Sequence, residues 1–382
     1  MAEATEVSQS GNGQSAIELW NQPLAYDRWV ASVGIPVHKG YFIEDLRTVQ
    51  LGRWDERDCD AAFIQLVGQD GVAETRLQEI APGKTLPRLR FGIDEVVYVV
   101  EGRGLTTLLW DNGQKTTFEW QKQSMFLLPR NCTYQLTNTQ GNARSLLMHT
   151  NYLPGAMASV GDIDLFFRPS SSNGKSASGP SVNMYSEAKA VAQEDGGPWG
   201  GVFWYGNFFP NMRAWENLTP FRGRGAGGHV VWIRFPNSPW TAHMSVFPAQ
   251  TYKKAHRHGP GFVIVIPTGA GYSVMWQEGK ENEKVWVPWN EASLFVPPHR
   301  WFHQHFNLGN EPARYLALHP PRGLPGYSEA IDNPGVDQVD YADEDPEVRR
   351  RFEEELAKRG MKSHMVEEAY KTRNYQWKYE GD

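Results

Sequence analysis

The sequence predicts an all-β protein made of two tandem barrels, with short helices near its two ends. Short apolar segments rich in β-branched and aromatic residues recur at spacings of roughly 8–12 residues, which is typical of a sandwich or barrel. The 37 glycines and 25 prolines imply many turns between these segments. Because the 382 residues also show one pattern twice, we expect two domains, each with its own core.

The N-terminal part contains a tail and a first β domain. Residues 1–20 are polar and lack the cationic start and apolar segment of a secretory signal, so we expect a disordered tail. Residues 21–168 form the first domain, in which the stretch from Leu24 to Gly34 has the apolar spacing of a short helix. The strand-like segments that follow it are AAFIQLVG, EVVYVVEG, GLTTLLW, SMFLLP and ARSLLMHT.

The C-terminal part starts with a change of composition. Residues 169–200 are rich in Ser and Gly and are predicted to be a linker. A second β domain is expected over residues 201–325, and a helical tail over residues 326–382. In this tail Asp345 can cap a helix and Pro346 suits the first turn. The apolar stripe of that helix consists of Val348, Phe352 and Leu356.

The two β domains align with each other at a nearly constant offset. Four landmark pairs lie 167 to 170 residues apart: Gly102 and Gly269, Pro129 and Pro298, Asn138 and Asn307, His149 and His319. Unrelated segments would not keep such an offset. The sequence therefore predicts an internally duplicated domain.

Three histidines in the second domain form a candidate metal site. His256 and His258 lie one residue apart, so in an extended strand they project from the same face. His303 follows 45 residues after His258, on a segment that hairpin connections would bring alongside. Imidazole suits zinc, copper, iron and nickel, and three protein ligands leave coordination positions open for chemistry. We therefore predict that these three residues hold one metal ion.

The first domain lacks these ligands. The alignment places Arg88 and Arg90 at the positions of His256 and His258, and Tyr134 opposite His303. A guanidinium group has no lone pair to offer a metal. The first domain is therefore predicted to hold no such ion and to serve packing or dimerisation, with an independent active site as the alternative.

At these residues the chain resembles a bicupin, a pair of small double-stranded β-helix (jelly-roll) barrels. The matching positions in the second domain are His256, His258, Gly269, Pro298, His303 and Asn307. Phe262 stands where the cupin pattern has a metal-binding Glu, and Arg300 stands where it has Gly. The first domain keeps the Glu position as Glu95. Within the superfamily the chain looks most like gentisate 1,2-dioxygenase, although those enzymes usually carry the metal in the other cupin.

The resemblance implies an iron(II)-dependent, ring-cleaving dioxygenase that acts on a hydroxylated aromatic acid and dioxygen. Mn, Ni, Zn or Cu are the alternative metals. Because the three imidazoles are neutral, they leave a divalent ion near a charge of +2, which favours an anionic chelating substrate. Two other interpretations stay open: a non-redox metal enzyme (isomerase, decarboxylase or lyase) and a non-catalytic bicupin that binds a ligand.

Further residues are candidates for the site. His305 shares the strand face of His303 and is either the third ligand or a proton carrier. Arg234 interrupts an apolar strand and is a candidate catalytic residue that could hold a substrate carboxylate, with an exposed or salt-bridged Arg as the alternative. Tyr272 is a candidate to hydrogen-bond the substrate, with a core hydroxyl as the alternative. The aromatic candidates for a substrate pocket, each with plain core packing as its alternative, are Phe262, Trp276 and Trp301.

Composition narrows the partners. A formal charge of -6 offers no general attraction to nucleic acid or anionic membranes, and no apolar run approaches the ~20 residues of a membrane span. Cys59 and Cys132 are too few for a disulfide framework, so we expect a cytoplasmic protein. Bicupins commonly associate, and we expect a homo-oligomer, either a dimer or a tetramer.

Overall fold

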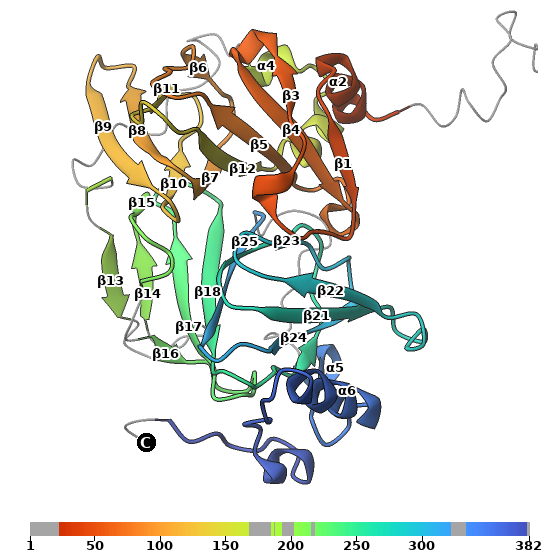
Figure 1. Cartoon of the computed structure of the whole chain (residues 1–382). Coiled ribbons are helices and arrows are strands. Elements are labelled where there is room, and N and C mark those ends of the chain that lie inside the picture. The colour runs from red at the N-terminus through yellow and green to blue at the C-terminus, as the bar shows by residue number, and fades with distance from the viewer. Residues whose placement is uncertain are drawn as a thin grey trace, which may run out of the picture.

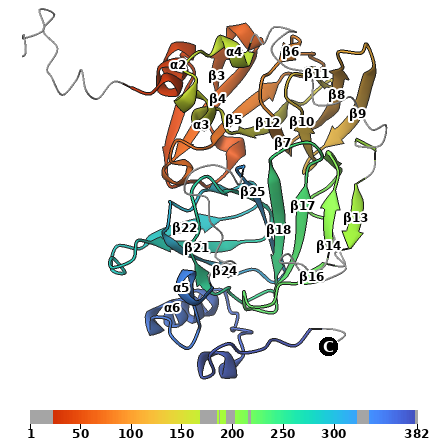
Figure 2. The ribbon, with the colours of Figure 1, turned by 180° about the vertical axis from the view of Figure 1, so that it is seen from behind.

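Two β-barrels lie one above the other in the computed structural model (Figure 1). The structure describes residues 23–167, 185–186, 188–192, 202–214, 218–321 and 334–379, so the predicted tail at residues 1–20 lies outside it. Helix α2 (Ala25–Val33) lies beside the first barrel, and helix α6 (Pro346–Ala357) lies at the opposite end of the molecule (Figure 2). The predicted fold class, an all-β pair of cupin-like barrels with short helices, is confirmed.

The first barrel consists of a large and a small sheet. The large sheet has the order β1-β4-β5-β12-β7-β10-β15, with β3 added beside β4, and the small sheet has the order β6-β11-β8-β9. The large-sheet strands are β1 (Val37–Gly40), β3 (Gly52–Trp54), β4 (Cys59–Leu66), β5 (Glu74–Ile80), β7 (Glu95–Glu101), β10 (Met125–Leu128), β12 (Ser145–Asn151) and β15 (Phe208–Phe209). The small-sheet strands are β6 (Leu89–Arg90), β8 (Arg103–Leu109), β9 (Lys115–Gln121) and β11 (Thr133–Asn138).

The second barrel repeats this strand order. Its large sheet runs β13-β14-β17-β18-β25-β20-β23-β2, with β16 beside β17, and its small sheet runs β22-β21-β24-β19-β26. The large-sheet strands are β2 (Phe42–Ile43), β13 (Lys189–Ala192), β14 (Val202–Tyr205), β16 (Thr219–Pro220), β17 (His229–Arg234), β18 (Thr241–Phe247), β20 (Val263–Thr268), β23 (Leu294–Phe295) and β25 (Ala313–His319). The small-sheet strands are β19 (Ala255–His256), β21 (Gly271–Trp276), β22 (Val285–Trp289), β24 (Phe302–Asn307) and β26 (Gln338–Val339). The segment β5-β12-β7-β10 thus matches β18-β25-β20-β23, as expected of a duplication.

Each barrel takes a short strand from the other half of the chain. Strand β2 pairs with β23 of the second barrel, and β15 pairs with β10 of the first. Strand β13, inside the range predicted as linker, pairs with β14 and extends the second large sheet. The remaining linker residues up to 184 and from 193 to 200 lie outside the described part of the chain. The two halves of the sequence are therefore interlocked at strands that are too short to recognise by periodicity.

The largest apolar cluster lies between the two barrels. It contains Leu77 and Val96 of the first large sheet together with Met244 and Leu316 of the second, all fully buried. Separate clusters fill each barrel, and another lies between the small sheet of the second barrel and helix α6. Burial of apolar area at about 25 cal/mol per Å² makes the face between the sheets the main source of their association.

The terminal helices follow their local sequence signals. Gly34, at φ 76°, ends α2 in the left-handed conformation that glycine adopts without strain. The Asp345 side chain accepts a hydrogen bond from the backbone N–H of Glu347 and caps α6. Shorter helices are α3 (Leu153–Ser159), α4 (Asp164–Phe167), α5 (Pro334–Asp337) and the 3-10 turns η1 (Leu46–Thr48), η2 (Asp55–Arg57), η3 (Val67–Gln69) and η4 (Glu367–Tyr370). Among the described helices, none combines the length and the apolar character needed to cross a membrane.

Candidate metal centre

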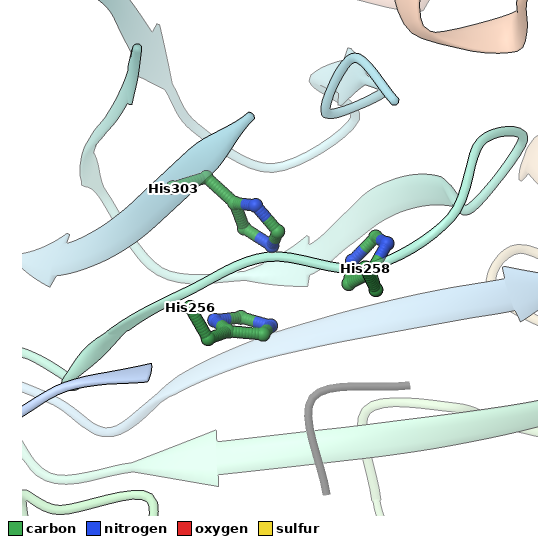
Figure 3. Close-up of side chains that lie close together, drawn as sticks. All are labelled: His256, His258 and His303. Atoms are coloured by element: carbon green, nitrogen blue, oxygen red, sulfur yellow. The ribbon is translucent and has the colours of Figure 1, made fainter. Parts of the chain in front are cut away.

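Two strands of the small sheet bring the predicted histidines together. His256 on β19 pairs directly with His303 on β24 in antiparallel register. His258 lies two residues beyond His256 and faces the same side, as the period of an extended chain requires. The three side chains point toward one another from neighbouring segments (Figure 3).

The three imidazoles are close enough to share one ion. One ligand nitrogen from each ring lies within 4.8 Å of the others. The ring centroids are 4.1 Å apart for His256 and His303, 4.6 Å for His258 and His303, and 5.5 Å for His256 and His258. All three residues are buried. Among the described residues, no other group of His, Cys, Asp and Glu has this geometry.

Backbone carbonyls orient two of the rings. His258 Nδ1 lies 2.8 Å from the carbonyl oxygen of Gly259, and His303 Nδ1 lies 3.2 Å from that of Trp301. In a neutral imidazole this nitrogen is the donor, so each ring keeps a lone pair on Nε2. His303 Nε2 and His256 Nδ1 are buried without a hydrogen-bond partner among the described residues. Orphaned nitrogens that converge in this way fit a metal ion.

Burial keeps these imidazoles neutral. Removal from water lowers the pKa of His258 to about 4. Burial, followed by the positive charge of Arg224, lowers the pKa of His256 well below its ordinary value. The pKa of His303 is lowered in the same direction by burial and then by His258 and His305. Near neutral pH each of the three rings therefore has one nitrogen lone pair to offer, while its other nitrogen keeps a proton.

A cavity of about 50 Å³ lies against the three histidines. It has room for a few water molecules, since one water needs about 10–15 Å³ of such volume. Its lining is mostly aromatic and imidazole, with one guanidinium group: Phe221, Arg224, Trp232, His243, His256, His258, Phe262, Ile264, His303, His305, Tyr315, Ala317 and His319.

Two further predicted residues line this cavity. The ring of Phe262 lies 4.0 Å from that of His258, so an apolar side chain occupies the place where the cupin pattern has a carboxylate. His305 lies beside the three histidines, with its ring centroid 5.5 Å from that of His303. Its Nδ1 is 2.8 Å from Ser273 Oγ, and its Nε2 is buried without a partner among the described residues. The nitrogen cluster that could hold an ion therefore contains His303, and His305 is its neighbour in the cavity.

Four predicted residues lie elsewhere. Arg234 is exposed at the end of β17, where the strand leaves the core, so a substrate carboxylate in the cavity is out of its reach. Tyr272 and Trp276 pack with Phe306 and Phe302 on the outer face of the small sheet, toward α6.

Strand alternation explains the placement of Tyr272 and Trp276. The inward positions of β21 are Ser273 and Met275, which pair with His305 and His303. Trp301 packs against Tyr41 and contributes only its carbonyl oxygen to the site.

Sequence reasoning missed the basic residues around the cavity. Arg224 lines it from the loop before β17, and its Nη1 lies 3.0 Å from Gln338 Oε1. Lys253 is fully buried nearby, its amine contacts Ser245 Oγ, and burial lowers its pKa well below the ordinary lysine value. Lys253 stands three residues before His256, but no local pattern marks it.

Two histidines face each other on the far wall of the cavity. His243 Nδ1 lies 2.7 Å from His319 Nε2, and both residues line the cavity. Their strands β18 and β25 pair in the sheet, with Thr241 opposite His319, so the register would have placed these two histidines side by side.

The first barrel holds an ion network at the corresponding place. The Arg76 guanidinium contacts the carboxylates of Glu74 and Glu95, with 2.5 Å between Arg76 Nη2 and Glu95 Oε2. His149 Nδ1 lies 2.6 Å from Glu95 Oε1, and Asn151 Nδ2 donates to Glu95 Oε2 at 3.0 Å. At this place in the first barrel the positive charge is therefore the Arg76 side chain.

Comparisons with known proteins give only distant structural likenesses. No protein-family model matches the chain, and no curated protein sequence matches it. An oxalate decarboxylase mutant structure from Bacillus subtilis is similar at 12% identity over 73% of this chain and 76% of that chain, with a TM-score of 0.44. The oxalate decarboxylase–formate complex of Lactobacillus farciminis is similar at 15% identity over 75% of this chain and 87% of that chain, with a TM-score of 0.45. No conclusion about substrate or reaction rests on these likenesses.

Proposed function

We propose that the protein is a metal-dependent enzyme acting on a small anionic substrate whose oxygen atoms bind the metal. The observation that carries the proposal is the convergence of three buried, neutral imidazoles on the wall of a cavity that also contains Arg224. His256, His258 and His303 would hold the ion. A bound divalent ion would supply open coordination positions and Lewis-acid or redox chemistry.

Charge favours an anionic substrate. The ligand set contains three neutral imidazoles and no carboxylate, because Phe262 replaces the glutamate of the cupin pattern. An acid with two adjacent oxygen donors would supply the missing negative charge. The Arg224 guanidinium, which is buried at the cavity wall, supports binding of the same anion through charge-assisted hydrogen bonds.

The remaining cavity residues control water and protons. Phe221, Trp232 and Phe262 make much of the wall apolar, which strengthens electrostatic interactions inside. Ser273 Oγ accepts a hydrogen bond from Trp289 Nε1 at 3.1 Å and can donate its own proton to His305 Nδ1. In that arrangement the His305 proton is on Nε2, from which it can donate a hydrogen bond to a substrate oxygen in the cavity.

The form of the reaction implied by the sequence resemblance is ring cleavage by dioxygen with iron(II). A hydroxylated aromatic acid carries the required pair of oxygen donors, and the aromatic walls suit its ring. This substrate requires the cavity to widen when the acid enters, because its present volume is about 50 Å³.

The cavity volume favours a second candidate reaction. A non-redox isomerisation, decarboxylation or lyase reaction on an acid of a few heavy atoms needs less space than an aromatic ring. A divalent ion held by His256, His258 and His303 would supply Lewis-acid chemistry for that reaction, and Mn, Zn or Ni would serve as well as iron. His305 and the His243–His319 pair then provide proton transfer on two sides of the cavity.

The test begins with metal-free protein loaded anaerobically with Fe(II), Mn(II) or Zn(II). Elemental analysis is expected to give about one ion per chain. Oxygen uptake with salicylate and gentisate tests the dioxygenase, and product analysis with short 2-hydroxy and 2-oxo acids tests the non-redox reaction. His256→Ala should abolish both activities. A ligand-binding role that survives this substitution, with no turnover by any metal form, would overturn the proposal.

A further inference from the structure

The C-terminal tail supplies the outer edge of the sheet that carries the metal ligands. We call residues 337–344 the C-terminal strap. Its strand β26 pairs with β19, with Gln338 opposite His256 and Val339 opposite Ala255. Strand β19 has only two residues, with β24 on its other side. One of the ligand-bearing segments is thus enclosed between its barrel partner and the strap.

One carboxylate of the strap contacts both ligand-bearing segments. Asp337 Oδ1 accepts from Arg257 Nε at 3.0 Å, and Arg257 stands between His256 and His258. The same carboxylate accepts two hydrogen bonds from Arg300, at 2.6 and 3.1 Å, three residues before His303. The Arg257 backbone N–H also donates to the Asp337 carbonyl oxygen at 2.9 Å. Asp337 is 6% exposed, so little water competes for these bonds.

The rest of the strap contacts the same part of the barrel. Gln338 accepts from Arg224 at the cavity wall and donates to the Gly223 carbonyl oxygen at 3.0 Å. Further contacts of the strap with the barrel are Lys254 to Asp340 at 2.6 Å, Tyr341 to the Tyr252 carbonyl oxygen at 2.6 Å and Gln304 to Glu344 at 3.1 Å. These contacts reach the chain immediately before His256 and immediately after His303.

We propose that the strap completes the metal centre and that Asp337 is a positioning residue, fixing the spacing between the His256–His258 segment and the His303 segment. The inference rests on the proposed metal-dependent function. Side chains that orient ligands commonly change metal affinity by about 10–100-fold when replaced. Asp337 acts on the histidines indirectly, through Arg257 and Arg300, so we expect a change at the lower end of that range.

The experiment titrates Co(II) into metal-free, full-length protein and records the visible absorption of the bound ion. Asp337→Asn keeps the shape of the side chain and removes its charge. We expect the affinity to fall about tenfold and the absorption spectrum to change, because the ligand spacing relaxes. Asp337→Glu should recover part of the loss. The matched control is Asp343→Asn, since Asp343 pairs with Arg373 inside the tail, and its affinity should stay within about twofold.

The outcomes separate the two proposals. Equal Co(II) affinity and equal spectra for Asp337→Asn and the parent protein would overturn the positioning role, even if the variant melts at a lower temperature. Should Asp337→Asn not fold, Arg300→Gln tests the same contact, because the Arg300 side chain is 36% exposed and Arg257 remains paired. Its expected loss is about threefold, and an unchanged affinity would refute the inference. A parent protein that binds no Co(II) would remove both the proposed function and the role of the strap.

Discussion

The two barrels share one strand order but handle charge at their centres in different ways. In the first barrel, Arg76 is buried between Glu74 and Glu95, so a cation of the chain itself neutralises the carboxylates. In the second barrel, His256, His258 and His303 present uncharged lone pairs to one another. The centre of the first barrel therefore contains its own cation, whereas the centre of the second barrel has a place where an added ion could bind. The two barrels thus keep one strand order while the polar residues at their centres differ.

The comparison predicts different weaknesses. The first barrel depends on the completeness of its ion network, because a buried charge without its partner is costly. The second barrel has no such charge among His256, His258 and His303, and its proposed function depends on the spacing of these three residues. The experiments below separate these two dependences, starting with the largest expected effect.

Removal of the internal cation should damage the first barrel most. Arg76→Met leaves Glu74 and Glu95 buried without their counter-charge, and we expect the free energy of unfolding to fall by about 3–5 kcal/mol. Urea unfolding followed by tryptophan fluorescence measures the change. The control Arg53→Gln removes exposed ion pairs with Asp55 and Asp58, and its free energy of unfolding should change far less, because solvent screens exposed pairs. A similar loss in both variants would contradict the interpretation of the network.

Acid should weaken the first barrel. Burial opposes ionisation of Glu95, but the charge of Arg76 prevails and lowers its pKa to about 2. The folded value lies below the usual 4.5, so the stabilisation is present above pH 4.5 and is lost as the pH falls toward 2. The loss amounts to about 3 kcal/mol at most. Urea unfolding at a series of pH values measures it, and Glu95→Gln should flatten the acid slope.

The strap should have the opposite pH dependence. Burial raises the pKa of Glu344 to about 7, above its usual 4.5. Its contribution is therefore present below pH 4.5 and is lost as the pH rises through 7. Glu344→Gln should remove this decline in the same unfolding series, and an unchanged slope between pH 4.5 and 7 would refute the assignment.

Loss of a ligand should affect ion binding rather than the fold. We expect His303→Ala to weaken Co(II) binding at least 100-fold, or about 2.7 kcal/mol, because two imidazoles hold a divalent ion poorly. His305→Ala is the matched control on the same strand and should keep its affinity within about threefold. Calorimetric titration measures both variants. The reverse order would mean that His305 is the third ligand.

A carboxylate returned to the second barrel should make its ion site stronger. Phe262→Glu places an acid where the cupin pattern has one, beside His258, and should raise Co(II) affinity about tenfold. The metal-free protein should become less stable, since the new charge is buried without a partner. Phe262→Gln has the same shape without the charge and should show no gain in affinity. Equal affinities for the two variants would show that position 262 does not reach the ion.

The smallest effect is expected on the outer face of the small sheet. The Tyr272 hydroxyl is buried without a hydrogen-bond partner among the described residues, so Tyr272→Phe should change the free energy of unfolding by less than about 0.5 kcal/mol. Metal affinity and activity should stay unchanged, because Tyr272 packs away from the cavity. Tyr315 lines the cavity, so the activity of Tyr315→Phe is compared with that of Tyr272→Phe. A drop in activity for Tyr272→Phe alone would return that residue to the site.

Much of the fold and part of the site could be predicted because their signals are local. Period-two alternation and turn residues define the strands, and the repeated offset defines the duplication. The same alternation also places the residues of the neighbouring strand. Once His303 and His305 face inward, their partners Met275 and Ser273 must also face inward, so Tyr272 and Trp276 face outward. Residue type alone suggested Tyr272 and Trp276 for the site, but the strand face decides their position, and it places both outside the cavity.

By itself the sequence determined the all-β class, the two tandem barrels and the histidines of the ion site, since each is encoded by spacing within one or two strands. Tertiary structure alone decided which residues complete that site. Arg224 reaches the cavity from a loop before β17, and Asp337 reaches Arg257 from 80 residues further along the chain. Such neighbours are set by the packing of sheets and by the path of the tail, which leave no periodic pattern in the chain. The candidate ligands are therefore recognisable from short sequence segments, whereas the residues that line and support the site come from distant parts of the chain.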